Sequence, residues 1–550
     1  MAQVAAAATA LPEVAVVVDQ VGGGRAETKW VCGAGGCAAQ ARIGAVAVGL
    51  RAVGEEISVD ATFETDAWVG RVAVELTLPG TAQALGRDLR RWVAPPIELG
   101  RFDPKWISVG AATVVVDDGV DGVRLAKVGA ATKLLVELLD VAERPFRHDT
   151  RCTTRWRDRN PRIPLATRFY VRGEKLAAQV RLLAGHPVPL VQSRWPSGRA
   201  AALVITDHAD QSTLSTFSAL VDALARRRLV LTKALFAVGG KARPQLELPA
   251  MVALADQLAG IGGEVVPHSA TPSPDQAATT EDALGLFDRW RPRSYIDHQP
   301  ETNCEAFNNE GWRMGGRWDL ASRLAKHGYE YIWAEGDDPP GPLDMLGRPT
   351  GAAWLYPLGR LEVGGPELWM WRSMWGFLDA GGFYAMYAPA KLDALEDARG
   401  LHVAHTYLET YHAPGTRFGQ RNLFVPVGKA RPGKPGPVRL APRFASLLDE
   451  LAARQERGTL WVTTMGALGE RVRASLGLRL RPRAGGWVIT VPVAVAGATF
   501  VLGEAAPHLT VDGKAPAGLR IEPAGTGWQT VFWADLPSGE AVVRLGGADQ

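Results

Sequence analysis

The chain has 550 residues, of which 47% are hydrophobic and 22% are charged. This composition excludes a disordered or fibrous chain, and two or three domains are expected, because one hydrophobic core rarely grows beyond roughly 250–300 residues. The formal net charge is only +3 and the basic residues are interspersed with acidic ones, so a nucleic-acid partner is not expected.

The N-terminal segment is rich in alanine but lacks the basic stretch of a secretory signal. No run of 18 or more apolar residues occurs, so no membrane span is expected. We expect a protein that acts outside the cytoplasm, exported by a signal that is not part of this sequence, while a cytoplasmic location stays open.

The four cysteines do not form a zinc-ribbon pattern, because only Cys32 and Cys37 stand close together. These two form either a short local disulfide or a pair of free thiols. Cys152 and Cys304 stand alone in the sequence and are expected to be ordinary buried residues.

Residues 1–190 are predicted to form a β-sandwich. Short segments of alternating apolar and polar residues, such as 57–66 and 71–80, are separated by Gly, Pro and Asp, which is typical of antiparallel strands joined by turns. Residues 167–185 are expected to supply the last hairpin, and a linker with Pro and Gly follows at 186–199.

Residues 195–475 are predicted to form a (β/α) barrel. An apolar strand at 201–206 precedes a helical pattern at 213–228, and strand-like and helix-like segments continue to alternate after it. Such alternation indicates a parallel sheet or barrel, and the number of repeats favours the barrel. The aromatic-rich segment 369–377 has helical spacing and is expected to pack in the core.

Residues 478–550 are predicted to form a small β domain, because apolar residues recur with period two. The residues predicted to share one face are Trp487, Ile489, Val491, Val493 and Val495. The expected architecture is therefore multidomain, with a central (β/α) barrel flanked by N- and C-terminal all-β, sandwich-like domains.

Polar clusters stand where strands of the predicted barrel end, which is where reactive groups lie in such barrels. The clusters are Asp207, His208 and Asp210; His268; Asp297, His298 and Glu301; and His402 with His405. A lone histidine at a strand end is more often structural, but coincidence at four ends favours one metal site, because imidazole and carboxylate together bind Zn²⁺ and similar ions. The alternative for Asp207 and Asp210 is a cap on the following helix.

These motifs resemble those of the polysaccharide deacetylases of the NodB type, also called carbohydrate esterase family four, over about half of the chain. That family opens its barrel with Thr-Phe-Asp-Asp-Gly, and the matching residues here are Ile205–Asp210. The resemblance makes Asp207 the catalytic base. It places the metal ligand on His208 by strict alignment, or on Asp210 if the loop is two residues longer.

The later motifs of the family match only in part. Its His-Ser-x-x-His motif resembles the segment that begins at His268, but Pro272 replaces the second histidine, and His298 from the next strand is expected to fill the vacant ligand position. Its Leu-x-His motif resembles the segment that contains His402 and His405, and His405 is preferred as the general acid.

The resemblance implies a metal-dependent hydrolase that removes acetyl or other acyl groups from a polysaccharide or amino sugar. The expected cofactor is a divalent ion, zinc in the first place and cobalt or nickel as alternatives. An exposed indole offers a flat apolar face to a sugar ring, although core packing is an equal alternative for the two tryptophans. The candidate substrate-binding residues are Glu301, Asn303, Trp312, Trp318 and Tyr407.

Two other functions stay open. The altered motifs fit a non-catalytic carbohydrate-binding protein on the same barrel, which metal content would distinguish from the enzyme. Paired carboxylates such as Glu301 and Glu409 fit a glycoside hydrolase, against which a loss of activity on chelation would argue.

Overall fold

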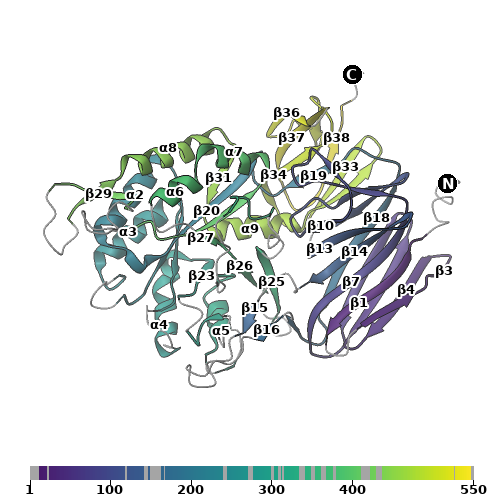
Figure 1. The fold of residues 1–550 in the computed structure, drawn as a ribbon, viewed down its shortest axis with the longest axis horizontal. Helices are drawn as coiled ribbons and strands as arrows, with labels where there is room; N and C mark the ends of the chain where they lie inside the picture. The colour runs from purple at the N-terminus through teal and green to yellow at the C-terminus, as the bar shows by residue number, and fades with distance from the viewer. Residues whose placement is uncertain are drawn as a thin grey trace.

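A computed structural model represents the chain. The residues that it describes are 11–20, 24–117, 120–140, 146–148, 163–165, 168–239, 245–270, 277–298, 303–307, 311, 315–316, 318–333, 341–347, 354–360, 367–375, 380–410, 422–428, 436–524 and 527–546. The chain is a multidomain α/β protein with central parallel strands and flanking antiparallel sheets (Figure 1).

Two antiparallel sheets pack against each other in the N-terminal part, to the right in Figure 1. Their strand orders are β10-β13-β14-β7-β1-β2, with β17 beside β7, and β3-β4-β5-β6-β18-β12-β11-β8-β9. Residues such as Val16 and Val48, one from each sheet, are buried in a common core, as alternation with period two requires. The antiparallel strands expected here are confirmed.

The strands of this part are β1 (Glu13–Gln20), β2 (Gly24–Thr28), β3 (Val31–Gly33), β4 (Gly36–Ile43), β5 (Val46–Val53), β6 (Glu56–Phe63), β7 (Ala67–Pro79), β8 (Ala82–Leu85), β9 (Trp92–Val93), β10 (Ile97–Gly100), β11 (Trp106–Val109), β12 (Ala112–Val116), β13 (Gly122–Val128), β14 (Ala131–Asp140), β15 (Phe146–His148), β16 (Ile163–Leu165), β17 (Arg168–Tyr170) and β18 (Lys175–Ala184). β15 and β16 pair only with each other among the described residues.

The hairpin predicted at 167–185 is wrong, because β17 and β18 belong to different sheets. β17 pairs with β7, whereas β18 lies between β6 and β12. The turn between them contains Gly173 with φ +90°, a conformation that favours glycine, and it carries the chain from one sheet to the other.

The cysteine expectations are settled in part. Cys32 and Cys37 form a disulfide between β3 and β4. Cys304 is also disulfide-bonded, so the expectation of an ordinary buried cysteine is wrong at this position. Cys152 lies outside the described residues.

Strands and helices alternate from β20 to α9, to the left in Figure 1. The strands are β20 (Ala201–Asp207), β21 (Thr232–Leu235), β22 (Glu264–Pro267), β23 (Ser294–Ile296), β24 (Tyr331–Trp333), β25 (Leu355–Arg360), β26 (Glu367–Trp371), β27 (Met374–Trp375), β28 (Leu401–Thr406), β29 (Phe424–Pro426), β30 (Val438–Leu440) and β31 (Leu460–Thr463). The helices are η2 (Ala209–Gln211), α2 (Leu214–Arg227), α3 (Pro249–Gly260), α4 (Ala277–Phe287), η3 (Asp288–Trp290), α5 (Leu320–Lys326), α6 (Ala380–Met386), α7 (Pro389–Asp397), α8 (Pro442–Glu456) and α9 (Met465–Leu476).

The first strand and helix of this part form as the sequence predicts. Every residue of β20 is buried, as in parallel strands covered on both faces. Thr213 caps α2 through a reciprocal capping box with Thr216, which satisfies the free N–H groups of the first turn. Thr213, and not Asp207 or Asp210, is therefore the cap of this helix.

The parallel strands form two sheets joined by one bridge among the described residues. The first has the order β22-β21-β20-β28-β27 with β31 also beside β20, and the second has the order β23-β24-β26-β25, in which only β25 is antiparallel. A parallel bridge between His268 and Ile296 links them. β27 is the last strand of the first sheet, and two residues separate it along the chain from β26, the strand next to the edge strand β25 of the second sheet.

The core packing predicted for 369–377 is confirmed, but the helical spacing predicted the wrong secondary structure. Trp369, Met370 and Trp371 lie in β26, while Met374 and Trp375 form β27. All but Trp375 are buried, so large apolar side chains fill both faces of the strand. A continuous apolar run of this kind does not distinguish a buried strand from a helix.

The C-terminal part consists of two antiparallel sheets, and the strands that come from the end of the chain are yellow in Figure 1. One has the order β19-β34-β37-β36 and the other β32-β33-β38-β35. The segment 186–199, expected as a linker, thus adds a strand to the first sheet. The strands are β19 (Leu190–Ser193), β32 (Arg479–Arg483), β33 (Gly486–Val491), β34 (Val495–Leu502), β35 (Thr510–Val511), β36 (Gly518–Ala524), β37 (Gly527–Leu536) and β38 (Gly539–Arg544).

The apolar face predicted for 487–495 is confirmed except at Val493. Trp487, Ile489 and Val491 are buried on β33, and Val495 is buried on β34. Val493 is 65% exposed, because the chain bends between the two strands.

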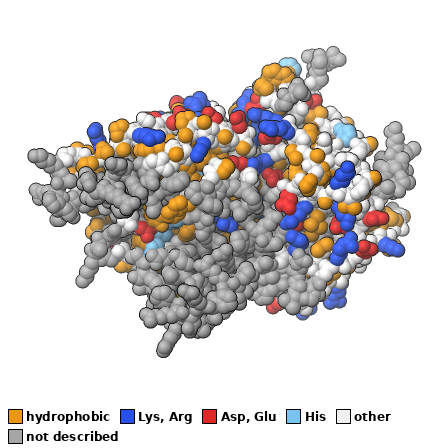
Figure 2. Space-filling view, in the orientation of Figure 1, with side chains coloured by type: hydrophobic (Ala, Val, Ile, Leu, Met, Phe, Trp, Pro, Cys, Tyr) orange, Lys and Arg blue, Asp and Glu red, His pale blue; other side chains and the backbone are white. Residues whose placement is uncertain are grey.

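The N- and C-terminal β units share a hydrophobic core. Trp106 and Val115 of the sandwich are buried together with Trp487 and Phe532, and the rings of Trp106 and Trp487 lie 5.6 Å apart. The face in Figure 2 carries basic and acidic side chains interspersed over these units. Among the described residues, no helix is both long enough and apolar enough to cross a bilayer.

Candidate metal centre

Asp210 lies between two histidines that come from different strand ends. Its Oδ2 lies 3.2 Å from His268 Nε2, and its Oδ1 lies 2.9 Å from His298 Nε2. Potential ligand atoms of His208, Asp210 and His268 lie within 4.8 Å of one another. Four of the residues singled out in the sequence therefore meet at the carboxyl ends of β20, β22 and β23.

The backbone at the junction of the two sheets orients these imidazoles. His268 Nδ1 faces the carbonyl oxygen of Ile296 at 3.4 Å, which leaves Nε2 directed toward Asp210. The backbone N–H of His298 donates to Ser269 Oγ at 2.8 Å. A hydrogen bond from the second ring nitrogen commonly fixes the orientation of a metal-binding histidine.

Electrostatic effects keep Asp210 ionised and favour the neutral form of the imidazoles of His268 and His208. Burial raises the pKa of Asp210, but hydrogen bonds from His268 and His298 outweigh it, so the pKa lies well below its ordinary value. Burial lowers the pKa of His268 despite its bond to Asp210. Burial, and then the charges of His405 and His268, lower the pKa of His208 well below its ordinary value. A carboxylate with neutral imidazoles is the form in which these groups bind a metal ion.

His208 lies in the interior of the site and stacks on His405, with the ring centroids 3.8 Å apart. Its Nδ1 is buried and has no hydrogen-bond partner among the described residues. An unpaired buried nitrogen is costly, so this position fits a further ligand to an ion.

Aromatic side chains surround His405 at the end of β28. Its ring centroid lies 5.2 Å from that of Trp333, 4.9 Å from that of Trp375 and 5.0 Å from that of Tyr407. The structure thus brings both His405 and the substrate-binding candidate Tyr407 to the cluster.

His402 lies on the same strand but has other partners. Its Nε2 lies 3.0 Å from the hydroxyl of Tyr387 on the α6–α7 connection, and its Nδ1 lies 3.0 Å from the carbonyl of Leu343. His402 and His405 are three positions apart on the strand, so alternation directs them to opposite faces. The preference for His405 at the cluster agrees with this placement.

Asp207 is fully buried and lies in a charged network beside the histidines. Lys233 Nζ contacts Asp207 Oδ2 at 2.6 Å and Glu409 Oε1 at 2.7 Å, and the backbone N–H of Leu408 donates to Asp207 Oδ1 at 2.6 Å. Thr216 donates to Glu409 Oε2 at 2.9 Å. One lysine therefore forms ion pairs with two buried carboxylates.

Burial acts on the members of this network in different ways. Burial lowers the pKa of Lys233, but Asp207 and Glu409 outweigh it and raise the value above its ordinary range. Burial raises the pKa of Glu409 to about 7, and the charge of Asp207 acts in the same direction. Glu409 is thus fully buried and bonded to Lys233 and Thr216.

Lys233→Met is expected to destabilise the fold by about 3–5 kcal/mol, because removing one partner leaves buried carboxylates without a counter-charge. Urea unfolding measures this change. Lys326→Met is the matched control, since Lys326 pairs with Glu281 on the surface and is 68% exposed, and such pairs contribute roughly 0–1 kcal/mol. Equal stability of the two variants would contradict the role of Lys233.

The remaining candidates have other described neighbours or lie outside the described residues. Asn303 is buried, and its Oδ1 accepts from the backbone N–H of Glu305 at 3.1 Å, so it stabilises its own turn. Trp318 is half-buried next to Asp319, the cap of α5. Glu301 and Trp312 lie outside the described residues.

The sequence analysis did not predict the partners of Asp207 or the aromatic side chains around His405. Lys233 stands in an otherwise uncharged strand, and a buried lysine requires a carboxylate partner, so its presence could have indicated the network. Trp333 and Trp375 carried no comparable signal, because a tryptophan at a strand end is most often part of a core.

No protein-family model matches the chain, and no curated protein matches it. Among solved structures, a Mycobacterium smegmatis protein described as a polysaccharide deacetylase is 15% identical with a TM-score of 0.31, over 51% of this chain and 93% of its own. A GH31 dextranase from Flavobacterium johnsoniae, solved with glucose, is 9% identical with a TM-score of 0.28, over 98% and 77%. A beta-arabinopyranosidase is 9% identical with a TM-score of 0.31, over 97% and 91%. At these values the likeness is distant and concerns the fold alone.

Proposed function

We propose that the protein is a metal-dependent hydrolase that removes acetyl or other acyl groups from a polysaccharide or amino sugar. The observation that carries the proposal is the convergence of Asp210, His268, His298 and His208 at neighbouring strand ends, with Asp207 and His405 beside them.

The donor set fits a divalent transition metal. One carboxylate and two or three imidazoles are ligands that zinc accepts, and cobalt and nickel accept similar donors. Asp210, His268 and His298 would hold the ion, and the buried, unpaired Nδ1 of His208 is available as a further ligand. The first motif offered His208 or Asp210 as the metal ligand. Of these two, Asp210 is the one that contacts both His268 and His298.

A bound ion of this kind supplies Lewis acidity, polarising an acyl carbonyl and making water easier to deprotonate. Asp207 would accept the proton of the attacking water. Its oxygens already accept from Lys233 and from the N–H of Leu408, but each carboxylate oxygen has two lone pairs, so capacity for the proton remains. Lys233 would keep Asp207 in place and act as a positioning residue.

His405 would protonate the departing amine or alcohol as a general acid. Its contacts with Trp333, Trp375 and Tyr407 hold the ring in one orientation. Such apolar walls around a reacting centre also exclude bulk water.

We further propose that the two parallel sheets form a closed barrel with the site at its carboxyl-terminal rim. The His268–Ile296 bridge joins the sheets on one side. The close succession of β26, which pairs with β24, and β27, which pairs with β28, supports closure on the other.

An extracytoplasmic location is part of the same proposal. A polysaccharide substrate is commonly met outside the cell membrane, and the disulfide between Cys32 and Cys37 together with the bonded Cys304 fits an oxidising compartment.

Incubation with acetylated chitin oligosaccharides or acetylated xylan tests the reaction. We expect release of acetate that stops on chelation and returns when Zn²⁺, Co²⁺ or Ni²⁺ is added. Acetate release unaffected by complete metal removal would contradict the metal-dependent reaction. Sugar release that resists chelation would instead support a glycoside hydrolase, and binding of metal and sugar without turnover would support a carbohydrate-binding protein.

A further inference from the structure

A buried glutamine, Gln245, joins two of the backbone segments that surround the metal centre. Gln245 is only 1% exposed. Its Oε1 accepts from the backbone N–H of Phe236 at 2.8 Å, and its Nε2 donates to the backbone carbonyl of Ala209 at 2.7 Å. Phe236 directly follows β21, and Ala209 begins η2 after β20. One side chain therefore connects the ends of two neighbouring parallel strands.

The bond to Ala209 holds the turn that carries Asp210. Ala209 stands between His208 and Asp210 in the sequence, and η2 is a single short turn whose N-cap makes no side-chain capping bond. The carbonyl of Ala209 also accepts from the backbone N–H of Ser212 at 3.0 Å, which closes the turn. The amide of Gln245 then ties the closed turn to the end of β21.

The bond to Phe236 holds an aromatic ring that contacts two histidines of the site. This ring is stacked on that of His268, with the centroids 4.9 Å apart and the planes at 25°. It lies edge-to-face against the ring of His298, with the centroids 5.0 Å apart and the planes at 89°. Because Phe236 is fully buried, a shift of its backbone would move the surface against which both imidazoles pack.

The spacing of these groups decides whether they can share one ion. Zinc binds nitrogen and oxygen ligands at about 2.0–2.2 Å, and a functional site requires its groups to be placed within about 0.5 Å. Gln245 supports the carboxylate of Asp210 through one of its hydrogen bonds and the two imidazoles through the other. It is therefore placed to set the distance of the carboxylate from the imidazoles.

We propose that Gln245 is a positioning residue of the metal centre, which holds the Asp210 turn and the Phe236 ring in the arrangement that one metal ion requires. This role rests on the metal centre of the proposed function. It adds a residue whose side-chain hydrogen bonds go to backbone groups and not to the ligand atoms. Residues that orient metal ligands typically change metal affinity by roughly 10–100-fold when they are replaced.

Gln245→Met tests this role, because methionine is close to glutamine in size but cannot donate to Ala209 and is only a weak acceptor for Phe236. We expect the Zn²⁺ affinity of the folded variant to fall by roughly 10–100-fold, measured by competition of the apo-protein with a chromophoric chelator. The visible absorption spectrum of the Co²⁺-loaded variant should also change, because it reports the geometry of the ligands. A glutamine that only stabilises the fold would affect the unfolding of the apo-protein and leave both readouts unchanged.

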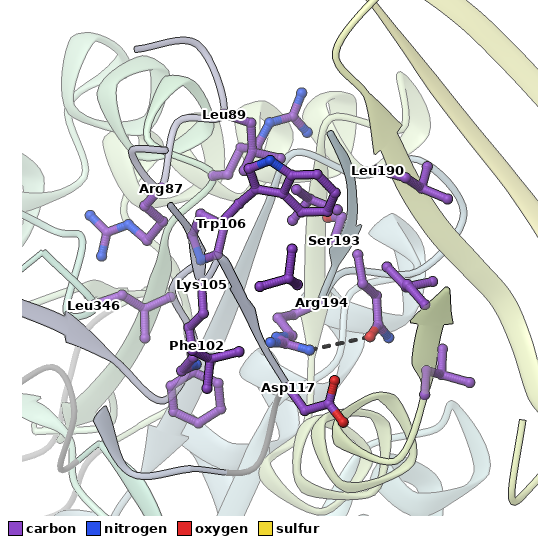
Figure 3. Close-up of a pocket in the computed structure, with 18 of the residues that line it drawn as sticks. Arg87, Leu89, Phe102, Lys105, Trp106, Asp117, Leu190, Ser193, Arg194 and Leu346 are labelled. Carbon is purple, nitrogen blue, oxygen red and sulfur yellow. Dashed lines mark hydrogen bonds between the residues drawn. The ribbon is translucent and has the colours of Figure 1, made fainter. Parts of the chain in front are cut away.

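Gln192→Met is the matched control. Gln192 is another buried glutamine, and its Oε1 accepts from Arg194 Nη1 at 3.3 Å, the dashed line in Figure 3. The pocket in that figure is lined by residues such as Trp106 of the sandwich and Leu346 of the α/β part, and its described lining includes no residue of the metal centre. This variant should keep the Zn²⁺ affinity and the Co²⁺ spectrum of the wild type.

Gln245→Asn covers the case in which Gln245→Met does not fold. It keeps the amide but shortens the side chain by one methylene, so it should bond only one of the two backbone groups and give a smaller loss of affinity. Wild-type Zn²⁺ affinity and an unchanged Co²⁺ spectrum in Gln245→Met, or in Gln245→Asn if only that variant folds, would overturn the positioning role and leave the metal centre intact. A wild-type protein that binds no metal would instead overturn the metal centre and the role of Gln245 with it.

Discussion

Asp207→Asn is expected to reduce turnover by roughly 10²–10⁴-fold, the contribution of a positioned general base, while the protein still binds its metal. Asparagine keeps the shape of the side chain and can still accept from the N–H of Leu408, but it loses the negative charge that accepts a proton. Lys233 keeps Glu409 as its counter-charge at 2.7 Å, so the variant should remain folded. Steady-state acetate release and metal content measure the two effects.

The control for this variant is Asp449→Asn, which makes the same change in a surface pair with Arg227 where the carboxylate is 64% exposed. It should leave turnover unchanged. Release of metal from Asp207→Asn would identify Asp207 as a ligand. A large loss of unfolding free energy together with full turnover of the folded fraction would make Asp207 a structural partner of Lys233 only.

His298→Ala is expected to weaken metal binding by at least tenfold and to lower activity with it. The sequence departs from the deacetylase pattern at Pro272, and His298 Nε2 lies 2.9 Å from the same carboxylate that His268 approaches. Removing this imidazole deletes a ligand and leaves Asp210 with one histidine fewer. Competition of the apo-protein with a chromophoric Zn²⁺ chelator measures the affinity.

His186→Ala serves as its control, because His186 is an exposed histidine of the sandwich region that should have no effect on zinc binding. Unchanged zinc affinity in His298→Ala would remove His298 from the site. The ligands would then be the group His208, Asp210 and His268, whose donor atoms already lie within 4.8 Å of one another.

Local patterns in the sequence predicted the elements that carry the site. β20 and α2 follow from an apolar run and a helical period, and a polar residue directly after a buried parallel strand lies at the carboxyl edge. For this reason the sequence predicted the site residues His208, Asp210, His268, His298 and His405. The order β22-β21-β20-β28 then brings four of them together, because neighbouring parallel strands end at the same edge. The bridge between His268 and Ile296 adds His298 from the end of β23.

Features that depend on contacts between distant segments could not be predicted from the sequence. The network of Asp207, Lys233 and Glu409 joins residues up to 202 positions apart, and no local period connects them. The strands within 369–377 were predicted as a helix, because burial of both faces removes the alternation that distinguishes a strand. β17 and β18 are separated because they join different sheets. The turn between them does not specify which sheet each strand joins.

Metal content after purification without chelators tests the central claim most directly. Elemental analysis of the protein dialysed against Zn²⁺ should give about one equivalent of zinc per chain. His268→Ala should give much less, because it removes a ligand whose donor atoms lie close to those of both Asp210 and His208. A wild-type protein that takes up no Zn²⁺, Co²⁺ or Ni²⁺ would contradict both the metal centre and the reaction proposed for it.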